Sequence, residues 1–212
     1  MGKTIFFDLD GTLTDSGEGI INCAAYALEQ LGYPVPDRVT MRCFVGPPLR
    51  DTFMKFGVKA EEAEEAIRIY RSRYIPIGRF ENAPYPGVHE LLGKLREEGH
   101  RLFVATSKPE TMSIEIMTHF DLAKYFDKIC GATMDSSRSE KSEVIAYLLS
   151  QIEAGEEILM VGDTAFDVTG AAAHGIPTIG VAWGYGEIAD MEKAGAKAIA
   201  TSMEHLHLLL NA

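Results

Sequence analysis

The sequence predicts an α/β protein with a parallel sheet core and an inserted all-helical domain. From residue 88 onward, short apolar runs alternate with segments of helical periodicity, an order typical of a parallel sheet covered by helices on both faces. Before that point, one apolar run is followed by residues 15–82, which show helical periodicity and no strong strand signal. With 46% hydrophobic residues among 212, the chain can bury the core of one domain with an insertion.

The first expected strand covers residues 3–7 and ends at Asp8. The next residues, Asp10-Gly11-Thr12, indicate a turn. In the helical stretch, apolar residues recur at helical spacing, and Tyr33-Pro34-Val35-Pro36 interrupts it. The helices expected there are 19–31, 48–56 and 60–74. We therefore expect a core formed by residues 1–14 and 83–212, and an inserted helical domain formed by residues 15–82.

The remaining elements follow in strict alternation after Tyr85-Pro86-Gly87. The expected strands are 101–106, 127–132 (weak), 157–163, 176–183 and 196–200. The expected helices are 88–98, 108–120, 142–152, 164–174, 187–194 and 203–210.

Composition narrows the function. The formal net charge is −11, with 31 acidic and 20 basic residues, which argues against a nucleic-acid or anionic-membrane partner because both need positive patches. Cys23, Cys43 and Cys130 lack metal-ligand spacing, so we expect buried, reduced thiols. No segment has the pattern of a leader peptide or a membrane span. We expect a cytoplasmic protein, either a monomer or a homodimer.

Polar residues follow three of the expected strands. The residues concerned are Asp8 and Asp10, Thr106 and Ser107, and Asp163, with Asp167 one helical turn later. Ligands of open parallel sheets bind beyond the carboxyl ends of the strands. A single acidic residue there is most often a turn or a helix cap, but three strand ends together indicate a site. Lys141, at the start of a helix, is the cation that could hold a phosphate beside it.

These residues suit a divalent cation. Asp8, Asp10 and Asp163 provide the hard oxygen ligands that Mg²⁺ prefers and shares with phosphate. Thr106 and Lys141 provide donors for phosphate oxygens, and backbone N–H groups at helix starts can provide more.

With these motifs in place, the chain resembles the haloacid dehalogenase (HAD) superfamily. DLDGT (8–12), the strand-end Thr106, Lys141 and GDTAFD (162–167) look like its four motifs in order, on a Rossmann-like core. The helical insertion is similar to the first type of cap domain in that family. The stretches FVGPPLRDTF (44–53), ATSKP (105–109) and VAWGYG (181–186) are similar to phosphoglycolate-phosphatase-like members.

The resemblance implies a mechanism. Asp8 would be the nucleophile that forms an aspartyl-phosphate, and Asp10 would serve as general acid and base. Mg²⁺ would be held by Asp8, the Asp10 backbone carbonyl and Asp163, with Asp167 near the metal or orienting Lys141. Thr106, Ser107 and Lys141 would bind the phosphoryl group. Because dehalogenases lack an aspartate at the position of Asp10, the chain looks like a phosphatase or phosphomutase.

Several alternatives remain open at this stage. The leading substrate, by resemblance, is phosphoglycolate, followed by a nucleoside 5′-monophosphate, with pyrophosphate also open. A hexose-phosphate mutase would need the same core residues, and outside enzymes a catalytically silent regulatory scaffold remains. Arg50 is the candidate cap residue for contacting a small phosphorylated metabolite, weighed evenly against a surface arginine. For Arg138 the favoured interpretation is an exposed residue.

Overall fold

The core is a six-stranded parallel sheet, as the sequence predicts. In this computed structural model, which describes residues 2–135, 137–153 and 157–212, the strand order is β5-β4-β1-β6-β7-β8. The paired strands run parallel throughout this sheet. The strands are β1 (Thr4–Phe7), β4 (Arg101–Pro109), β5 (Lys128–Ala132), β6 (Ile158–Gly162), β7 (Thr178–Val181) and β8 (Ala198–Ala200). The three central strands therefore bring their carboxyl ends, and the polar residues that follow them, to one edge.

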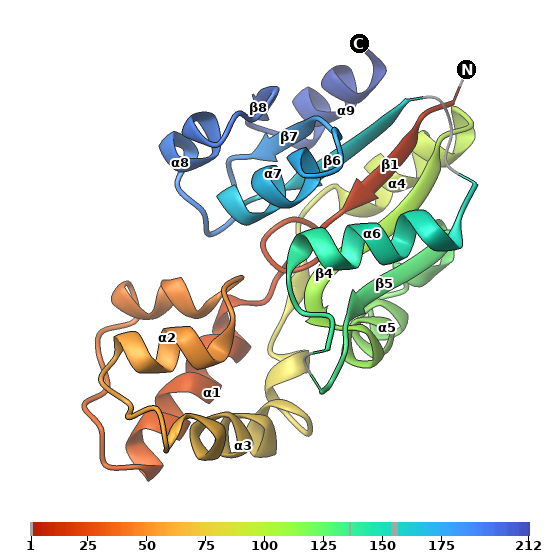
Figure 1. The fold of residues 1–212 in the computed structure, drawn as a ribbon. Helices are drawn as coiled ribbons and strands as arrows, with labels where there is room; N and C mark the ends of the chain where they lie inside the picture. The colour runs from red at the N-terminus through yellow and green to blue at the C-terminus, as the bar shows by residue number, and fades with distance from the viewer. Residues whose placement is uncertain (1, 136, 154–156) are drawn as a thin grey trace. The chain divides into compact units, whose positions relative to one another are not determined.

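Helices cover both faces of this sheet (Figure 1). They are α4 (Val88–Glu97), α5 (Glu110–His119), α6 (Lys141–Gln151), α7 (Ala165–Ala172), α8 (Ile188–Lys193) and α9 (Met203–Asn211), with a 3₁₀ turn, η3, at Ala123–Tyr125. Successive side chains of a strand point to opposite faces. Accordingly, Ile5 and Phe7 pack with α4, α5 and α9, whereas Phe6 packs with α6 and α7.

One strand is longer than the sequence pattern indicates. We expected a strand over 101–106 and a helix from residue 108, but β4 continues to Pro109 and α5 begins at Glu110. The pairing with β5 shifts register between Thr106 and Pro109, which marks an irregularity at the carboxyl end. Lys108 therefore lies on the strand, at the edge where the polar residues gather.

Residues Asp15–Ala83 form a second compact unit, separate from the unit of residues 1–14 and 84–212. Its elements are α1 (Gly17–Gln30), η1 (Thr40–Phe44), α2 (Leu49–Lys55), α3 (Ala63–Tyr74) and η2 (Gly78–Phe80). Where the chain passes between the units, β2 (Thr14–Asp15) pairs with β3 (Ala83–Pro84). These two short strands lack a sequence signal.

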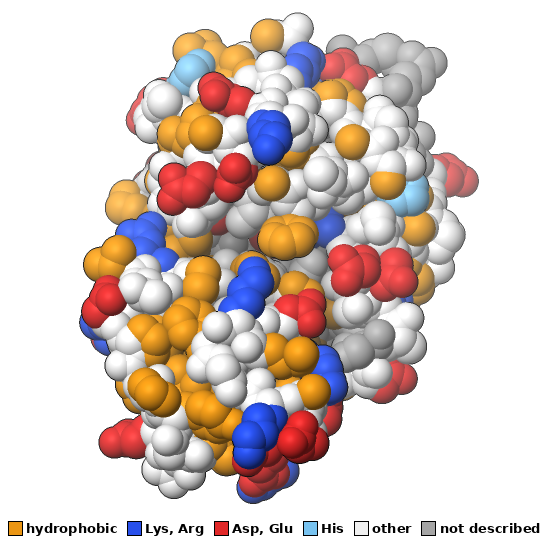
Figure 2. All heavy atoms as spheres, turned by 60° about the vertical axis from the view of Figure 1, so that its left-hand side comes forward, with side chains coloured by type: hydrophobic (Ala, Val, Ile, Leu, Met, Phe, Trp, Pro, Cys, Tyr) orange, Lys and Arg blue, Asp and Glu red, His pale blue; other side chains and the backbone are white. Residues whose placement is uncertain are grey.

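The helical unit has its own core. Phe44 lies against Phe53 and Phe56, and Tyr70 stacks on Tyr74. The approach of α1 to η2 is close, because a Cβ on Gly19 would lie 1.9 Å from the carbonyl oxygen of Gly78. Figure 2 shows hydrophobic side chains gathered over this unit. Its most exposed large apolar side chains include Val39 and Ile77.

The cysteines depart in part from expectation. Cys23 and Cys130 are buried thiols, as expected, but Cys43 is exposed on the short turn η1. Burial raises the pKa of the Cys130 thiol to about 11, which makes it a poor nucleophile. In the described part of the chain, every helix is too short or too polar to span a bilayer.

A substitution at Gly170 would test the close packing of α7 against α6, the helix that begins with Lys141. A Cβ there would lie 2.7 Å from Cβ and Cγ of Lys141, so α7 approaches α6 this closely only without a side chain. We expect Gly170→Ala to lower the free energy of unfolding by about 1–3 kcal/mol, the usual cost of overpacking. Urea unfolding followed by circular dichroism would measure it.

Gly93→Ala is the matched control, because Gly93 also lies within a helix. Its Cβ would meet only the edge of Tyr125, at 4.0 Å. There the higher helix propensity of alanine should raise stability by about 0.5–1 kcal/mol. Equal stabilisation by both substitutions would contradict the close α6–α7 contact.

Candidate active site

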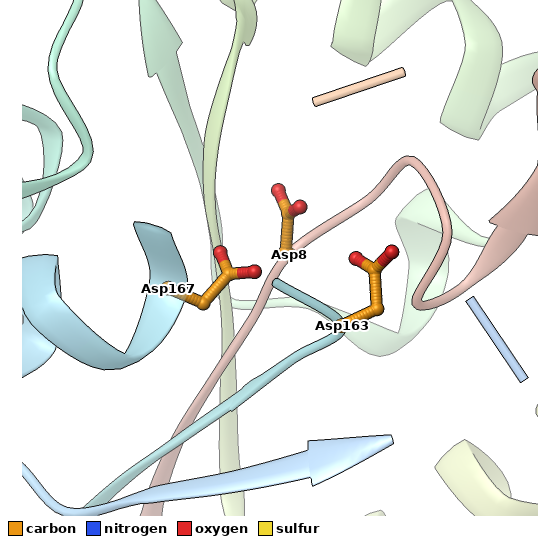
Figure 3. Close-up of side chains that lie close together, drawn as sticks. All are labelled: Asp8, Asp163 and Asp167. Carbon is orange, nitrogen blue, oxygen red and sulfur yellow. The ribbon is translucent and has the colours of Figure 1, made fainter. Parts of the chain in front are cut away.

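Three buried carboxylates meet at the carboxyl edge of the sheet. Asp8 follows β1, Asp163 follows β6, and Asp167 lies in the first turn of α7. One carboxylate oxygen of each lies within 4.8 Å of the others, and all three residues are buried. Figure 3 shows Asp8 between the other two. The structure therefore brings the side chains of Asp8, Asp163 and Asp167 together.

Lys141 lies beside two of these carboxylates. Its Nζ is 2.8 Å from Oδ1 of Asp8 and 2.7 Å from Oδ1 of Asp167, and it donates to the carbonyl of Ala105 at 3.0 Å. Lys141 is the first residue of α6, where Glu140 and Glu143 form a capping box. The capping box fixes the backbone of Lys141, so that its ammonium group lies between the carboxylates of Asp8 and Asp167.

Asp167 is held by its own helix. The backbone N–H and the hydroxyl of Thr164 both donate to its Oδ2, at 3.0 and 2.8 Å, which forms the capping box of α7. Its Oδ1 is left to face Lys141. The geometry thus supports the orienting role for Asp167, and it also leaves this residue within the carboxylate cluster.

Asp163 is oriented by two loops. Its Oδ1 accepts a hydrogen bond from the hydroxyl of Thr12 at 3.1 Å, and its Oδ2 accepts one from the N–H of Tyr185 at 2.8 Å. Gly11 makes the first loop compact, because it has a φ of 83° and a Cβ there would lie 2.2 Å from Oδ2 of Asp163. Nothing in the sequence indicated this contact of Thr12.

The cluster carries more negative than positive charge. Burial, followed by the charges of Asp167 and Asp8, raises the pKa of Asp163 to about 8. Burial also raises the pKa of Asp8 to about 6, although Lys141 opposes this shift. Burial alone would lower the pKa of Lys141, but Asp167 and Asp8 raise it above its ordinary value. Lys141 is therefore a permanent cation, and the carboxylates need a further one.

A divalent cation fits this donor set. Three carboxylates against one ammonium leave an excess of negative charge when all are ionised. The donors are oxygens, which Mg²⁺ prefers to nitrogen and sulfur. Asp8, Asp163 and Asp167 are the residues that would hold it.

The remaining candidates lie at the same edge or elsewhere. Thr106 is buried on β4, and a hydrogen bond from its side chain partly opposes the effect of burial, which raises the pKa of Asp8. Ser107 is half-buried beside it. Asp10 lies outside the three-carboxylate cluster, and its Oδ2 is 2.5 Å from Nζ of Lys108. This second lysine had no assigned role in the sequence analysis.

Two arginines are engaged in contacts that the sequence did not indicate. In the helical unit, Arg50 donates to Glu64 at 2.5 Å and to the carbonyl of Ala60. Its contact with a substrate stays a prediction. Arg138 is only 18% exposed, because it pairs with Glu110 and stacks on Tyr147. The interpretation of Arg138 as an exposed residue is therefore wrong. Through these contacts, Arg138 holds the segment before Lys141 against α5 and α6.

Comparison with known proteins identifies the family of this chain. The family model described as "Haloacid dehalogenase-like hydrolase" matches residues 5–181. A tyrosine-protein kinase, PtkA, of Mycobacterium tuberculosis is 43% identical over 93% of this chain and 68% of its own length. A 5′-nucleotidase of Pseudomonas aeruginosa is 44% identical over 86% of this chain and 83% of its own. A phosphoglycolate phosphatase of Aquifex aeolicus is 32% identical over 86% of both chains.

A solved structure has the same fold. A predicted phosphatase from Clostridium acetobutylicum superposes with a TM-score of 0.95 at 40% identity, over 100% of this chain and 99% of its own. The α/β sheet, the carboxylate cluster with its lysine, and these matches lead to one assignment. The chain belongs to the haloacid dehalogenase-like hydrolases.

Proposed function

We propose that this chain is a Mg²⁺-dependent phosphatase that hydrolyses a small phosphomonoester through an aspartyl-phosphate on Asp8. The observation that carries the proposal is the arrangement around Asp8. Its carboxylate lies at the end of a central strand, beside Lys141 and within a cluster that calls for a cation. A carboxylate so placed can attack phosphorus once the charge on the phosphoryl oxygens is compensated.

In the first step, an oxygen of Asp8 forms a bond to phosphorus, and the bond from phosphorus to the leaving oxygen breaks. Asp10 gives its proton to that oxygen, so an alcohol departs. In the second step, Asp10 takes a proton from water, whose oxygen attacks the same phosphorus. The Asp8–phosphorus bond then breaks, which returns the carboxylate and releases inorganic phosphate.

Lys141 and Thr106 would stabilise the charge on the phosphoryl oxygens during both steps. The carbonyl of Ala105 and Asp167 hold Lys141 in place for this. A bound Mg²⁺ would supply Lewis-acid charge compensation for the phosphoryl group. The chain's own contribution is the fixed placement of Asp167, through the capping contact with Thr164, and of Asp163, through the loop contact with Tyr185.

Two substrate classes come first. The relative named 5′-nucleotidase is 44% identical, whereas the relative named phosphoglycolate phosphatase is 32% identical. We therefore place a nucleoside 5′-monophosphate ahead of phosphoglycolate, although the sequence motifs had favoured the latter. Both are alkyl phosphates, so both need the leaving oxygen to be protonated.

A second candidate is phosphorylation of tyrosine in a protein. The relative named tyrosine-protein kinase is 43% identical over nearly the whole chain. The phosphatase and the tyrosine kinase would differ in the molecule that donates the phosphoryl group and in the molecule that accepts it. In this case the phosphoryl group would come from a nucleoside triphosphate, and a tyrosine hydroxyl would replace water in the second step.

The first prediction concerns the nucleophile. Phosphate release should occur with Mg²⁺ from at least one member of a panel: nucleoside 5′-monophosphates, phosphoglycolate, pyrophosphate and hexose phosphates. Asp8→Asn should abolish release from all of them while the circular dichroism spectrum is unchanged. Activity that survives this substitution would contradict the aspartyl-phosphate route, and silence of the wild type on the whole panel would favour a mutase or a scaffold.

The second prediction concerns the metal and pH. In the metal-free protein, the pKa of Asp163 is about 8 against an ordinary value of 3.8. Between these values the folded state binds more protons than the unfolded state, so this group makes stability fall as pH rises through about 8. With EDTA at about pH 8, Asp163→Asn should therefore melt several degrees above wild type, and the difference should shrink toward about pH 4.

With Mg²⁺ in place of EDTA, wild type should instead melt above Asp163→Asn. Mg²⁺ should raise the melting temperature of wild type, because it binds only the folded state, and leave Asp163→Asn nearly unchanged. Asp190→Asn, an exposed residue in the first turn of α8, is the matched control and should follow wild type. A variant at Asp163 that melts below wild type in EDTA would count against the charge argument.

The third prediction separates the two candidates. Radiolabelled ATP is incubated with the protein, Mg²⁺ and a tyrosine-containing copolymer. If hydrolysis is the function, the label should appear as inorganic phosphate or remain in ATP, and acid-stable phosphotyrosine should be absent. Phosphotyrosine that forms in wild type and disappears in Asp8→Asn would instead support the kinase candidate.

A further inference from the structure

A second buried lysine lies at the carboxyl edge of the sheet, apart from Lys141. The side chain of Lys108 is 7% exposed, and its Nζ is 2.5 Å from Oδ2 of Asp10, whose side chain is 11% exposed. The two lysines contact different acidic residues. Lys141 contacts Asp8 and Asp167, whereas Lys108 contacts Asp10.

The backbone holds Lys108 in this place. Its N–H donates to the hydroxyl of Thr106 at 3.3 Å, within the irregular end of β4. Gly131 of β5 lies under the same segment, and a Cβ on it would lie 2.5 Å from the carbonyl oxygen of Lys108. The N–H of Gly131 donates to Glu110, which also pairs with Arg138. The strand end that carries Lys108 is therefore fixed from both sides.

The carboxylate of Asp10 needs such a contact. Asp10 lies in the loop between Asp8 and Thr14, and its Oδ1 is buried without a hydrogen-bond partner in the described part of the chain. The lysine therefore engages one carboxylate oxygen and leaves the other open. A general acid must present one oxygen to the leaving group in a fixed direction, because its effect depends on geometry before acidity.

We propose that Lys108 is a positioning residue, which holds Oδ2 of Asp10 so that Oδ1 faces the leaving oxygen and later the attacking water. The inference rests on the proposed function, since it assumes that Asp10 transfers the proton. It adds a residue outside the four sequence motifs. Lys108 acts through Asp10 and itself forms no bond in the reaction.

The test uses the leaving group. A nucleoside 5′-monophosphate or phosphoglycolate, whichever the panel identifies, releases an alkoxide that must be protonated. 4-Nitrophenyl phosphate releases a stable phenolate that needs no proton. The parameter is kcat/KM, because it reports the steps up to aspartyl-phosphate formation, where the leaving group departs.

Lys108→Met should lower kcat/KM for the alkyl phosphate on the order of 100-fold, a size typical of a misplaced general acid. The value for 4-nitrophenyl phosphate should change little. Lys108→Arg should keep kcat/KM for the alkyl phosphate close to the wild-type value, because arginine keeps a cation beside Asp10. Lys124→Met is the matched control: Lys124 also pairs with an aspartate, Asp121, but on the surface, and both substrates should then behave as with wild type.

A double substitution gives an independent readout. Asp10→Asn alone should also lower kcat/KM for the alkyl phosphate and leave the value for 4-nitrophenyl phosphate little changed. Adding Lys108→Met to Asp10→Asn should then have little further effect on either value. Residues that act through one another are non-additive in this way, whereas independent residues add. Additive losses would overturn the inference, as would equal losses for both substrates, which would place Lys108 on the phosphoryl group.

The remaining outcomes are also decisive. A rise in KM confined to phosphoglycolate would make Lys108 a substrate-binding residue and overturn the positioning role. If Lys108→Met fails to fold, as judged by circular dichroism, Lys108→Gln undergoes the same comparison. Failure of the proposed function looks different, because then wild type would hydrolyse neither ester or Asp8→Asn would remain active.

Discussion

The structure depends on one electrostatic constraint: three carboxylates share a buried site with one lysine. Carboxylates that approach this closely repel, and burial removes the water that would screen them. Burial and the neighbouring carboxylates accordingly raise the pKa of Asp163 to about 8. Burial also raises the pKa of Asp8 to about 6, although Lys141 opposes this shift. Without a further cation the cluster is destabilising above these values. A protein keeps such an arrangement only where a ligand compensates it, which is why the cluster indicates a function rather than a structural role.

The surrounding fold holds the repelling carboxylates in fixed positions. Asp167 is fixed by the capping box of α7, and Asp163 by hydrogen bonds from Thr12 and Tyr185. Space for the cluster comes from glycines, since a Cβ on Gly162 would lie 2.3 Å from the carboxyl carbon of Asp167. The ligand therefore meets donors that are already oriented, and the cost of ordering them is met by folding.

Much of this site could be predicted from sequence because it depends on strand ends. Asp8, Thr106 and Asp163 each follow a readable apolar run, and parallel strands bring their carboxyl ends to one edge. Asp167 and Lys141 could be predicted because each occupies the first turn of a helix with an identifiable start.

The contacts that escaped prediction depend on tertiary pairing. Arg138 and Glu110 are distant in sequence and belong to different elements, so nothing local shows that they meet. Thr12 likewise contacts Asp163 from the loop after a neighbouring strand, although the two residues are far apart in sequence. Lys108 differs, because a signal existed: the residue before a proline disfavours helical geometry, so Lys108 before Pro109 should have extended the strand. Helical periodicity after residue 108 outweighed that signal and placed Lys108 on the helix.

The division of the two lysines bears on how one core serves relatives with different names. In the proposed mechanism, Lys141 and the carboxylates it contacts serve the phosphoryl group, whichever molecule carries that group. Lys108 and Asp10 would serve the leaving group and the attacking water or hydroxyl. A change of acceptor from water to a tyrosine hydroxyl leaves the first group untouched and makes new demands on the second. Functional divergence within this family should therefore be sought first around Asp10 and Lys108, which the proposed mechanism places at the leaving group and the acceptor.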